Sequence, residues 1–188
     1  LRLKIVEMVV SAREGHIPSS FSIVDILDYL YGNVLSVNSN SYESENRDYF
    51  ILSKGHGSAA LYSVLNKYKF ISDKDIKDYC QRDGILGGHP DSTKVPGIEA
   101  STGSLGHGFP TAIGVGLGLK IKEKKNNVFV LIGDGECHEG TIWESAHIAV
   151  NQGLGNICGI LDWNKSASQL MPIDDLPNKW SSFGWEVE

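Results

Sequence analysis

The sequence is poor in cysteine, and its few cysteines form no recognisable set. Cys80, Cys137 and Cys158 are odd in number and widely spaced, with no CxxC pair among them. Small secreted folds usually carry an even set of cysteines, and structural zinc sites usually use closely spaced ones. The pattern therefore favours neither a disulfide scaffold nor a zinc site, and we expect a reducing compartment, the cytoplasm.

An excess of basic residues is also missing. The 17 Lys and Arg residues stand against 23 Asp and Glu residues, which gives a formal net charge of −6. This balance disfavours a nucleic-acid-binding protein. One small basic cluster closes an apolar, helix-like run and is best interpreted as a solvated helix end; it comprises Lys120, Lys122, Lys124 and Lys125.

No hydrophobic run is long enough to suggest a membrane span. The most apolar segment, Ser104–Lys122, contains His107 and Pro110, and its apolar part falls short of the ~20 residues that a span needs. We expect a buried helix there instead. Nothing visible resembles a signal peptide, and since the sequence begins with Leu1 rather than Met, we expect that a few leading residues are missing.

What is present is an alternation of helical and strand patterns over 188 residues, of which 41% are hydrophobic. Helical periodicity is found over Leu3–Ala12 and Ala59–Tyr68, and over a segment that starts with a capping signal at Ser22 and Asp25 and ends at Tyr31. Two more helices are expected to begin at Ser72 and Leu105, and another, after the second strand, to end at Gln152. Strands are predicted at Tyr49–Leu52, Val128–Ile132 and Ile157–Leu161, with a final strand starting at Gly184–Val187. This order predicts one α/β domain, residues 1–188, with a mainly parallel sheet flanked by helices.

Two glycine-rich segments stand out. The segment Arg82–Thr102 shows no period, and a loop of this length in a compact domain is more often functional than idle. The helical pattern that follows contains five glycines, each costing up to ~1 kcal/mol relative to alanine. They are Gly106, Gly108, Gly114, Gly116 and Gly118. The close approach of another helix, internal or from another chain, would explain them.

An aspartate between two glycines follows the most apolar strand. Gly133, Asp134 and Gly135 come directly after Val128–Ile132, and Asn164 follows the next strand along the chain. Ligands of parallel sheets bind outside the carboxyl ends of the strands. Carboxylate and amide oxygens suit Mg²⁺ or Ca²⁺, and phosphate oxygens with a water would complete the coordination. A metal-bridged diphosphate is the preferred interpretation; the alternative is that Asp134 caps a helix and Asn164 closes a turn.

These residues resemble a known family. GDGECHEG followed by LDWNKS is similar to the thiamine-diphosphate signature of the transketolase family. The resemblance continues, in the family's order, through REGHIPSS, RDYFILSKGHGSAALY, GGHPDSTKVPGIEASTGSLGHG and KWSSFGWEV. It covers almost the whole chain and implies that family's three-layer thiamine-diphosphate-binding fold.

The resemblance also implies a metal and cofactor site. Asp134 and Asn164, with the main-chain carbonyl of Ser166, would hold Mg²⁺, or Ca²⁺ in its place. Gly133 and Gly135 would lie against the diphosphate, with the Gly135 N–H donating to it.

Three histidines have counterparts in the family. His56 would face the diphosphate, while His16 and His89 would line the channel and assist proton transfers on the sugar, work that suits an imidazole. Gly103 and Leu105 would pack near the aminopyrimidine.

The remaining motif residues have other expected roles. Glu139 and Glu144 would lie at a subunit interface, close to the cofactor and the two linked active sites. His107 stands where many relatives have Gln and is not expected to be catalytic; His138 and His147 are expected to be surface or core residues.

The implied reaction is transfer of a two-carbon ketol unit from a ketose to an aldose, with sugar or sugar-phosphate substrates. The family's cofactor also needs a pyrimidine-binding domain, whose glutamate bonds the aminopyrimidine. Because the sequence ends at GWEVE, we expect an N-terminal-type subunit or fragment, truncated at the C-terminal end of its domain. It would act only with a separate pyrimidine-binding C-terminal subunit, in a homodimer or heterotetramer.

Departures from the family pattern keep other functions open. GHIPSS replaces the usual GHPG, and KSASQLMPIDD after Asn164 is also atypical, so a pathway for an unusual sugar is an alternative. Further candidates are another thiamine-diphosphate enzyme and a catalytically silent regulatory subunit. A Rossmann dehydrogenase is rejected, because Gly114-x-Gly116-x-Gly118 is not GxGxxG and follows no strand.

Overall fold

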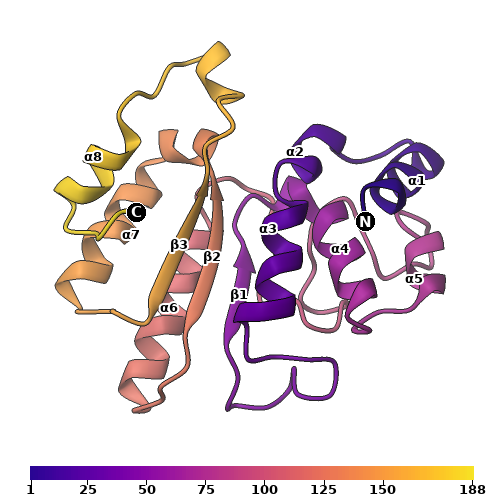
Figure 1. Ribbon diagram of the computed structural model, residues 1–188, viewed down its shortest axis with the longest axis horizontal. Coiled ribbons are helices and arrows are strands. Elements are labelled where there is room, and N and C mark those ends of the chain that lie inside the picture. The colour runs from indigo at the N-terminus through magenta and orange to yellow at the C-terminus, as the bar shows by residue number, and fades with distance from the viewer.

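A computed structural model describes residues 1–188 (Figure 1). Its sheet contains three parallel strands in the order β1 (Tyr49–Leu52), β2 (Val128–Gly133) and β3 (Ile157–Asp162). Val128 pairs with Tyr49 on one side and with Ile157 on the other, so the carboxyl ends of all three strands lie at one edge. The expected α/β class with a parallel sheet is confirmed.

Eight α-helices and four short helical turns connect and cover the strands. The helices are α1 (Arg2–Ala12), α2 (Ile17–Phe21), α3 (Val24–Tyr29), α4 (Ser58–Lys67), α5 (Asp73–Lys77), α6 (Gly108–Ile121), α7 (Gly140–Asn151) and α8 (Leu176–Ser182). The turns are η1 (Leu30–Val34), η2 (Gly55–Gly57), η3 (Asp134–His138) and η4 (Ala167–Gln169). No helix has both the length and the apolar character that crossing a membrane requires.

The helices form layers on the two faces of the sheet. Figure 1 shows α1 to α5 on one side and α6, α7 and α8 on the other. Alternate strand residues face opposite layers: Leu52 and Leu131 belong to one buried cluster, and Ile51 and Val130 to the other. Burial on both faces explains why β1 and β2 are continuously apolar rather than alternating, whereas β3, at one edge of the sheet, is only partly buried.

The helix start expected at Ser72 is correct, and the capping signal expected at Ser22 is not. Ser72 and Asp75 form a capping box at the start of α5. Ser22, by contrast, does not cap α3, whose N-cap residue is Ile23 and which has no side-chain cap. The Ser22 hydroxyl instead donates to the Asp162 carboxylate at 2.7 Å, because tertiary packing offers it a charged acceptor.

The glycines of α6 have a different explanation from the one expected. A Cβ on Gly116 would lie 2.7 Å from Cδ1 of Ile157, so the close neighbour is strand β3 and not another helix. A Cβ on Gly108 would lie 2.5 Å from the Ser53 Cα. Gly114 and Gly118 have nothing within 4 Å of this position. The expectation of a close helix within the chain is therefore wrong for these glycines of α6. It is correct for Gly106, just before α6, where a Cβ would lie 2.6 Å from Oγ1 of Thr141 in α7.

The expected C-terminal strand is also absent, since residues 184–187 are irregular. The Trp185 indole donates to the Ala146 carbonyl at 3.1 Å, and its ring centroid lies 5.3 Å from that of Trp180. The Trp185 ring thus packs on α7 and α8, and these contacts hold residues 184–187 in place without strand pairing.

Candidate functional site

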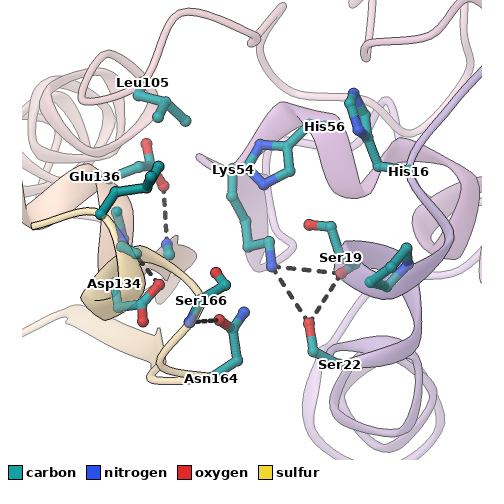
Figure 2. A pocket seen from close by; sticks show the side chains of 15 residues that line it. His16, Ser19, Ser22, Lys54, His56, Leu105, Asp134, Glu136, Asn164 and Ser166 are labelled. Atoms are coloured by element: carbon teal, nitrogen blue, oxygen red, sulfur yellow. Dashed lines mark hydrogen bonds between the residues drawn. The ribbon is translucent and has the colours of Figure 1, made fainter.

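A cavity of about 580 Å³ lies at the carboxyl edge of the sheet. Its walls come from α2, from the segment after β1, from the β2–η3 junction, and from the loop after β3. Figure 2 shows the side chains of these segments around a common space. This is the position at which parallel sheets bind ligands.

Asp134 lies in this cavity, and one of its two carboxylate oxygens has no hydrogen-bond partner. The residue is 2% exposed, and its Oδ1 accepts the Gly135 N–H at 2.9 Å. Its Oδ2 is buried and has no hydrogen-bond partner. An unpaired buried carboxylate oxygen is unfavourable, and a bound cation would satisfy it. Asp134 is the N-cap residue of neither η3 nor α7, whose N-cap residues are Gly133 and Glu139, so the alternative interpretation of Asp134 as a helix cap finds no support.

Asn164 and Ser166 line the same cavity and face Asp134 in Figure 2. The Asn164 Oδ1 accepts the Ser166 N–H at 2.9 Å, and its Nδ2 donates to Asp162 Oδ2 at 2.9 Å. No group of three or more His, Cys, Asp or Glu side chains is placed to hold a metal ion. A metal here would therefore need amide and carbonyl oxygens, which are hard ligands like the carboxylate.

Gly133 and Gly135 also line the cavity. The Gly135 N–H, expected to donate to a diphosphate, donates here to Asp134. The Gly135 N–H would have to leave the Asp134 carboxylate before this N–H could donate to a phosphate oxygen.

Glu136 is a functional candidate that the sequence analysis missed. It is 1% exposed and accepts hydrogen bonds from the Ser53 hydroxyl at 2.7 Å, the Gly106 N–H at 2.9 Å and the Gly133 N–H at 3.0 Å. Burial raises the pKa of this carboxyl, and the three hydrogen bonds oppose that rise. The only sequence signal is its place two residues after Asp134, beside a buried strand.

Lys54 and Asp162 form a second feature that was missed. Their charged atoms are 2.6 Å apart, and the side chains are 1% and 8% exposed. Burial would raise the pKa of Asp162, but hydrogen bonds from Lys54 and Ser22 and the Lys54 charge hold it below its usual value. Lys54 lines the cavity, and its motif position was noted without any partner.

His16 and His56 are brought together at the cavity wall. Their ring centroids lie 5.7 Å apart with the planes nearly perpendicular. Burial, the positive charge of Lys54 and the neighbouring His16 and His89 lower the pKa of His56 to about 4. His56 is therefore neutral near pH 7, with one nitrogen able to donate and the other to accept.

The other expected residues are placed differently. Leu105 lines the cavity, whereas His89 and Gly103 do not. His89 is exposed, and a Cβ on Gly103 would lie 3.0 Å from its Cδ2. These two residues pack against each other beside the cavity.

Glu139 and Glu144 are exposed and lie outside the cavity. Glu139 immediately precedes α7, and a Cβ on Gly106 would lie 2.6 Å from its Cβ. His107 and His147 are exposed as well, while His138 is partly buried with an unpaired Nε2.

Comparison with known proteins identifies the family. A family model described as "Transketolase, thiamine diphosphate binding domain" matches residues 1–188. The chain belongs to the transketolase family. Its match is to the part of transketolase that binds thiamine diphosphate, in agreement with the cavity at the carboxyl edge of the sheet.

Several transketolase relatives are similar over nearly the whole chain. The chain is 35% identical to one subunit of the apulose-4-phosphate transketolase of Phocaeicola vulgatus, covering 99% of this chain and 68% of the relative. It is 36% identical to the "6-deoxy-6-sulfo-D-fructose transketolase subunit SqwG" of Clostridium sp., covering 93% and 65%. The chain thus spans about two thirds of the length of these relatives.

Solved transketolase structures share the fold. The transketolase from Leishmania mexicana superposes with a TM-score of 0.90 at 26% identity, covering 98% of this chain and 30% of that one. The transketolase from Campylobacter jejuni gives 0.86 at 28% identity, covering 98% and 31%. The three-layer transketolase fold implied by the sequence motifs is confirmed.

Proposed function

We propose that this chain is the N-terminal, thiamine-diphosphate-binding subunit of a two-subunit transketolase that transfers a two-carbon ketol unit from a ketose to an aldose. The observation that carries the proposal is the buried, unpaired Oδ2 of Asp134, which lies beside Asn164 and Ser166 in the cavity.

A divalent metal, Mg²⁺ or Ca²⁺, would be held by Asp134, Asn164 and the Ser166 carbonyl. The donor set fits because all three atoms are hard oxygens, as such cations prefer. The diphosphate would lie between this metal, His56 and the backbone of Gly135.

When bound, thiamine diphosphate supplies the electron sink that allows the carbon–carbon bond beside a ketose carbonyl to break. His16 would hold and move protons at the sugar hydroxyls, and His56 would face the diphosphate. The low pKa of His56 keeps it uncharged, so it can donate from one nitrogen and accept at the other. His89 would act from the rim, and Leu105 and Gly103 would pack near the aminopyrimidine.

A separate pyrimidine-binding C-terminal subunit would complete the site with its glutamate, in a homodimer or heterotetramer. The names of the two relatives support this, because each is named as one subunit of a transketolase. Glu139 and Glu144 are exposed and thus available to such an interface. Cys80, Cys137 and Cys158 are free, which supports the cytoplasm as the compartment.

Unusual sugars are the favoured substrates. The relatives named above act, according to their names, on apulose 4-phosphate and on a sulfonated deoxyfructose. Pro18, Ser19 and Ser22, from the atypical segment that begins GHIPSS, line the cavity and are the residues here that would adapt it to such a sugar.

Calorimetric titration of thiamine diphosphate tests the proposal, with and without Mg²⁺ and the partner subunit. We expect binding that needs both the metal and Asp134, so that Asp134→Ala abolishes it. Asp174→Ala, which removes an exposed carboxylate outside the cavity, should bind like the wild type.

Two results would contradict this proposal. No binding even with the partner present would favour a silent regulatory subunit. Turnover of a ketose donor by this chain alone would remove the need for a partner.

A further inference from the structure

One oxygen of Asp162 is the centre of a hydrogen-bond network at the cavity wall. Its Oδ2 accepts from the Lys54 ammonium at 2.6 Å, the Ser22 hydroxyl at 2.7 Å and the Asn164 amide nitrogen at 2.9 Å. The three donors come from three different segments of the chain, all of which line the cavity. Asp162 itself does not line the cavity, so its contribution to a ligand must pass through these neighbours.

The ion pair bridges the two outer strands. Lys54 follows β1 and Asp162 ends β3, while β2 lies between them in the sheet. A Cβ on Gly133 would touch Cβ and Cδ of Lys54 at 3.6 Å, so the lysine stem passes over the end of β2. The ammonium therefore reaches Asp162 across the end of β2, which Asp134 directly follows.

This arrangement decides which end of the Asn164 amide is presented. Its Nδ2 donates to Asp162, and its Oδ1 accepts the Ser166 N–H at 2.9 Å. A flipped amide would set its oxygen against the Asp162 carboxylate and its NH₂ against the Ser166 N–H. Both contacts would be repulsive, and only the amide oxygen can ligate a metal.

We propose that Asp162 is a positioning residue for the metal site: it holds the Asn164 amide with its oxygen available to the cation, and Lys54 supplies the counter-charge that lets Asp162 be buried there. The inference rests on the proposed function, in which Asn164 is a metal ligand. Partners of this kind, which orient a ligand without touching the metal, typically change metal affinity by about 10- to 100-fold when removed.

A direct role of Lys54 on the diphosphate is the competing account. Lys54 lines the cavity, but its ammonium is engaged by Asp162 and lies 3.4 Å from both the Ser22 hydroxyl and the Ser19 carbonyl. A direct role would lower cofactor affinity at every metal concentration. A positioning role of Asp162 would instead raise the metal concentration required.

Two double variants separate these accounts without leaving a buried charge unpaired. Lys54→Met/Asp162→Asn keeps a side-chain oxygen that can accept from Asn164, whereas Lys54→Met/Asp162→Ala removes it. Arg47→Met/Glu99→Ala is a matched control, because it removes another buried ion pair, with side chains 10% and 14% exposed, outside the cavity. Each is measured in the complex with the partner subunit, as thiamine diphosphate binding at graded Mg²⁺.

We expect the alanine double variant to need about 10- to 100-fold more Mg²⁺ for half-saturation than the asparagine double variant. The control should match the wild type, and saturating Mg²⁺ should restore binding to the alanine variant. Equal Mg²⁺ dependence of the two double variants would overturn the positioning role of Asp162. Any loss of cofactor affinity caused by Lys54→Met is common to both variants and does not affect this comparison. If the wild type itself bound no cofactor at any Mg²⁺ concentration, the proposed function would fail first.

Discussion

The carboxylate of Glu136 accepts the hydroxyl of Ser53 at 2.7 Å, and this bond ties the segment after β1 to the segment after β2. The same carboxylate also accepts the N–H groups of Gly106 and Gly133. Three donors thus converge on one buried acid, which lines the cavity beside Asp134. The Glu136 side chain therefore holds together three of the segments that surround the candidate cofactor site.

Glu136→Gln should destabilise the chain, because the amide NH₂ would replace an acceptor with a donor among three existing donors. We expect a loss of about 1–3 kcal/mol in the free energy of unfolding, measured by urea denaturation. Glu7→Gln, an exposed substitution on α1, should change stability little. Equal stability of the Glu136 variant and the wild type would show that the three hydrogen bonds contribute nothing net.

Asp134→Asn should separate stability from ligand binding. Without metal, removal of the charge from a buried oxygen that has no partner should leave the melting temperature unchanged or raised. With Mg²⁺ and thiamine diphosphate, the wild type should be stabilised by mass action, and the variant should not. Thermal unfolding with and without both ligands measures this difference, and ligand stabilisation of the variant equal to that of the wild type would count against Asp134 as a ligand.

His56 should make stability depend on pH. Its pKa in the folded chain is about 4, below the ordinary 6.5, so the unfolded chain binds more protons between these values. The stabilising contribution is then complete above about pH 6.5 and declines as the pH falls towards 4. We expect His56→Gln to flatten this part of a urea-denaturation pH profile.

An NMR titration checks the same point directly. The His56 ring signals should remain those of the neutral form down to about pH 5, while a histidine titrating at pH 6.5 in this position would contradict the structure. His147→Gln, which changes an exposed residue of α7, should leave the slope of the stability profile as in the wild type.

The glycines of α6 should respond to alanine in opposite ways. Gly114→Ala adds a Cβ in open space and should stabilise the chain by up to ~1 kcal/mol through helix propensity. Gly108→Ala would place its Cβ 2.5 Å from the Ser53 Cα and should destabilise it, because backbone would have to move. Thermal unfolding of both variants compares them, and a shift in the same direction for both would contradict the packing.

The sequence by itself determined the positions of the three strands and of Asp134 and Asn164 at their ends. Short continuous apolar runs bounded by polar or glycine residues predict strands, and residues just after parallel strands share one edge of the sheet whatever the details of packing. The transketolase motifs added further cavity residues, namely His16, His56 and Leu105.

Only the tertiary structure decided the buried acceptors and their partners. Glu136 and Ser53 are 83 residues apart, and Asp162 and Lys54 are 108 residues apart. Their pairing depends on strand order and on which side chains share one face, which no local pattern encodes. For the same reason Ser22 follows a helix-start pattern but donates to Asp162, and Trp185 docks on aromatic neighbours rather than in a strand. Local periodicity fixed where each strand ends, and long-range packing fixed which charges meet there.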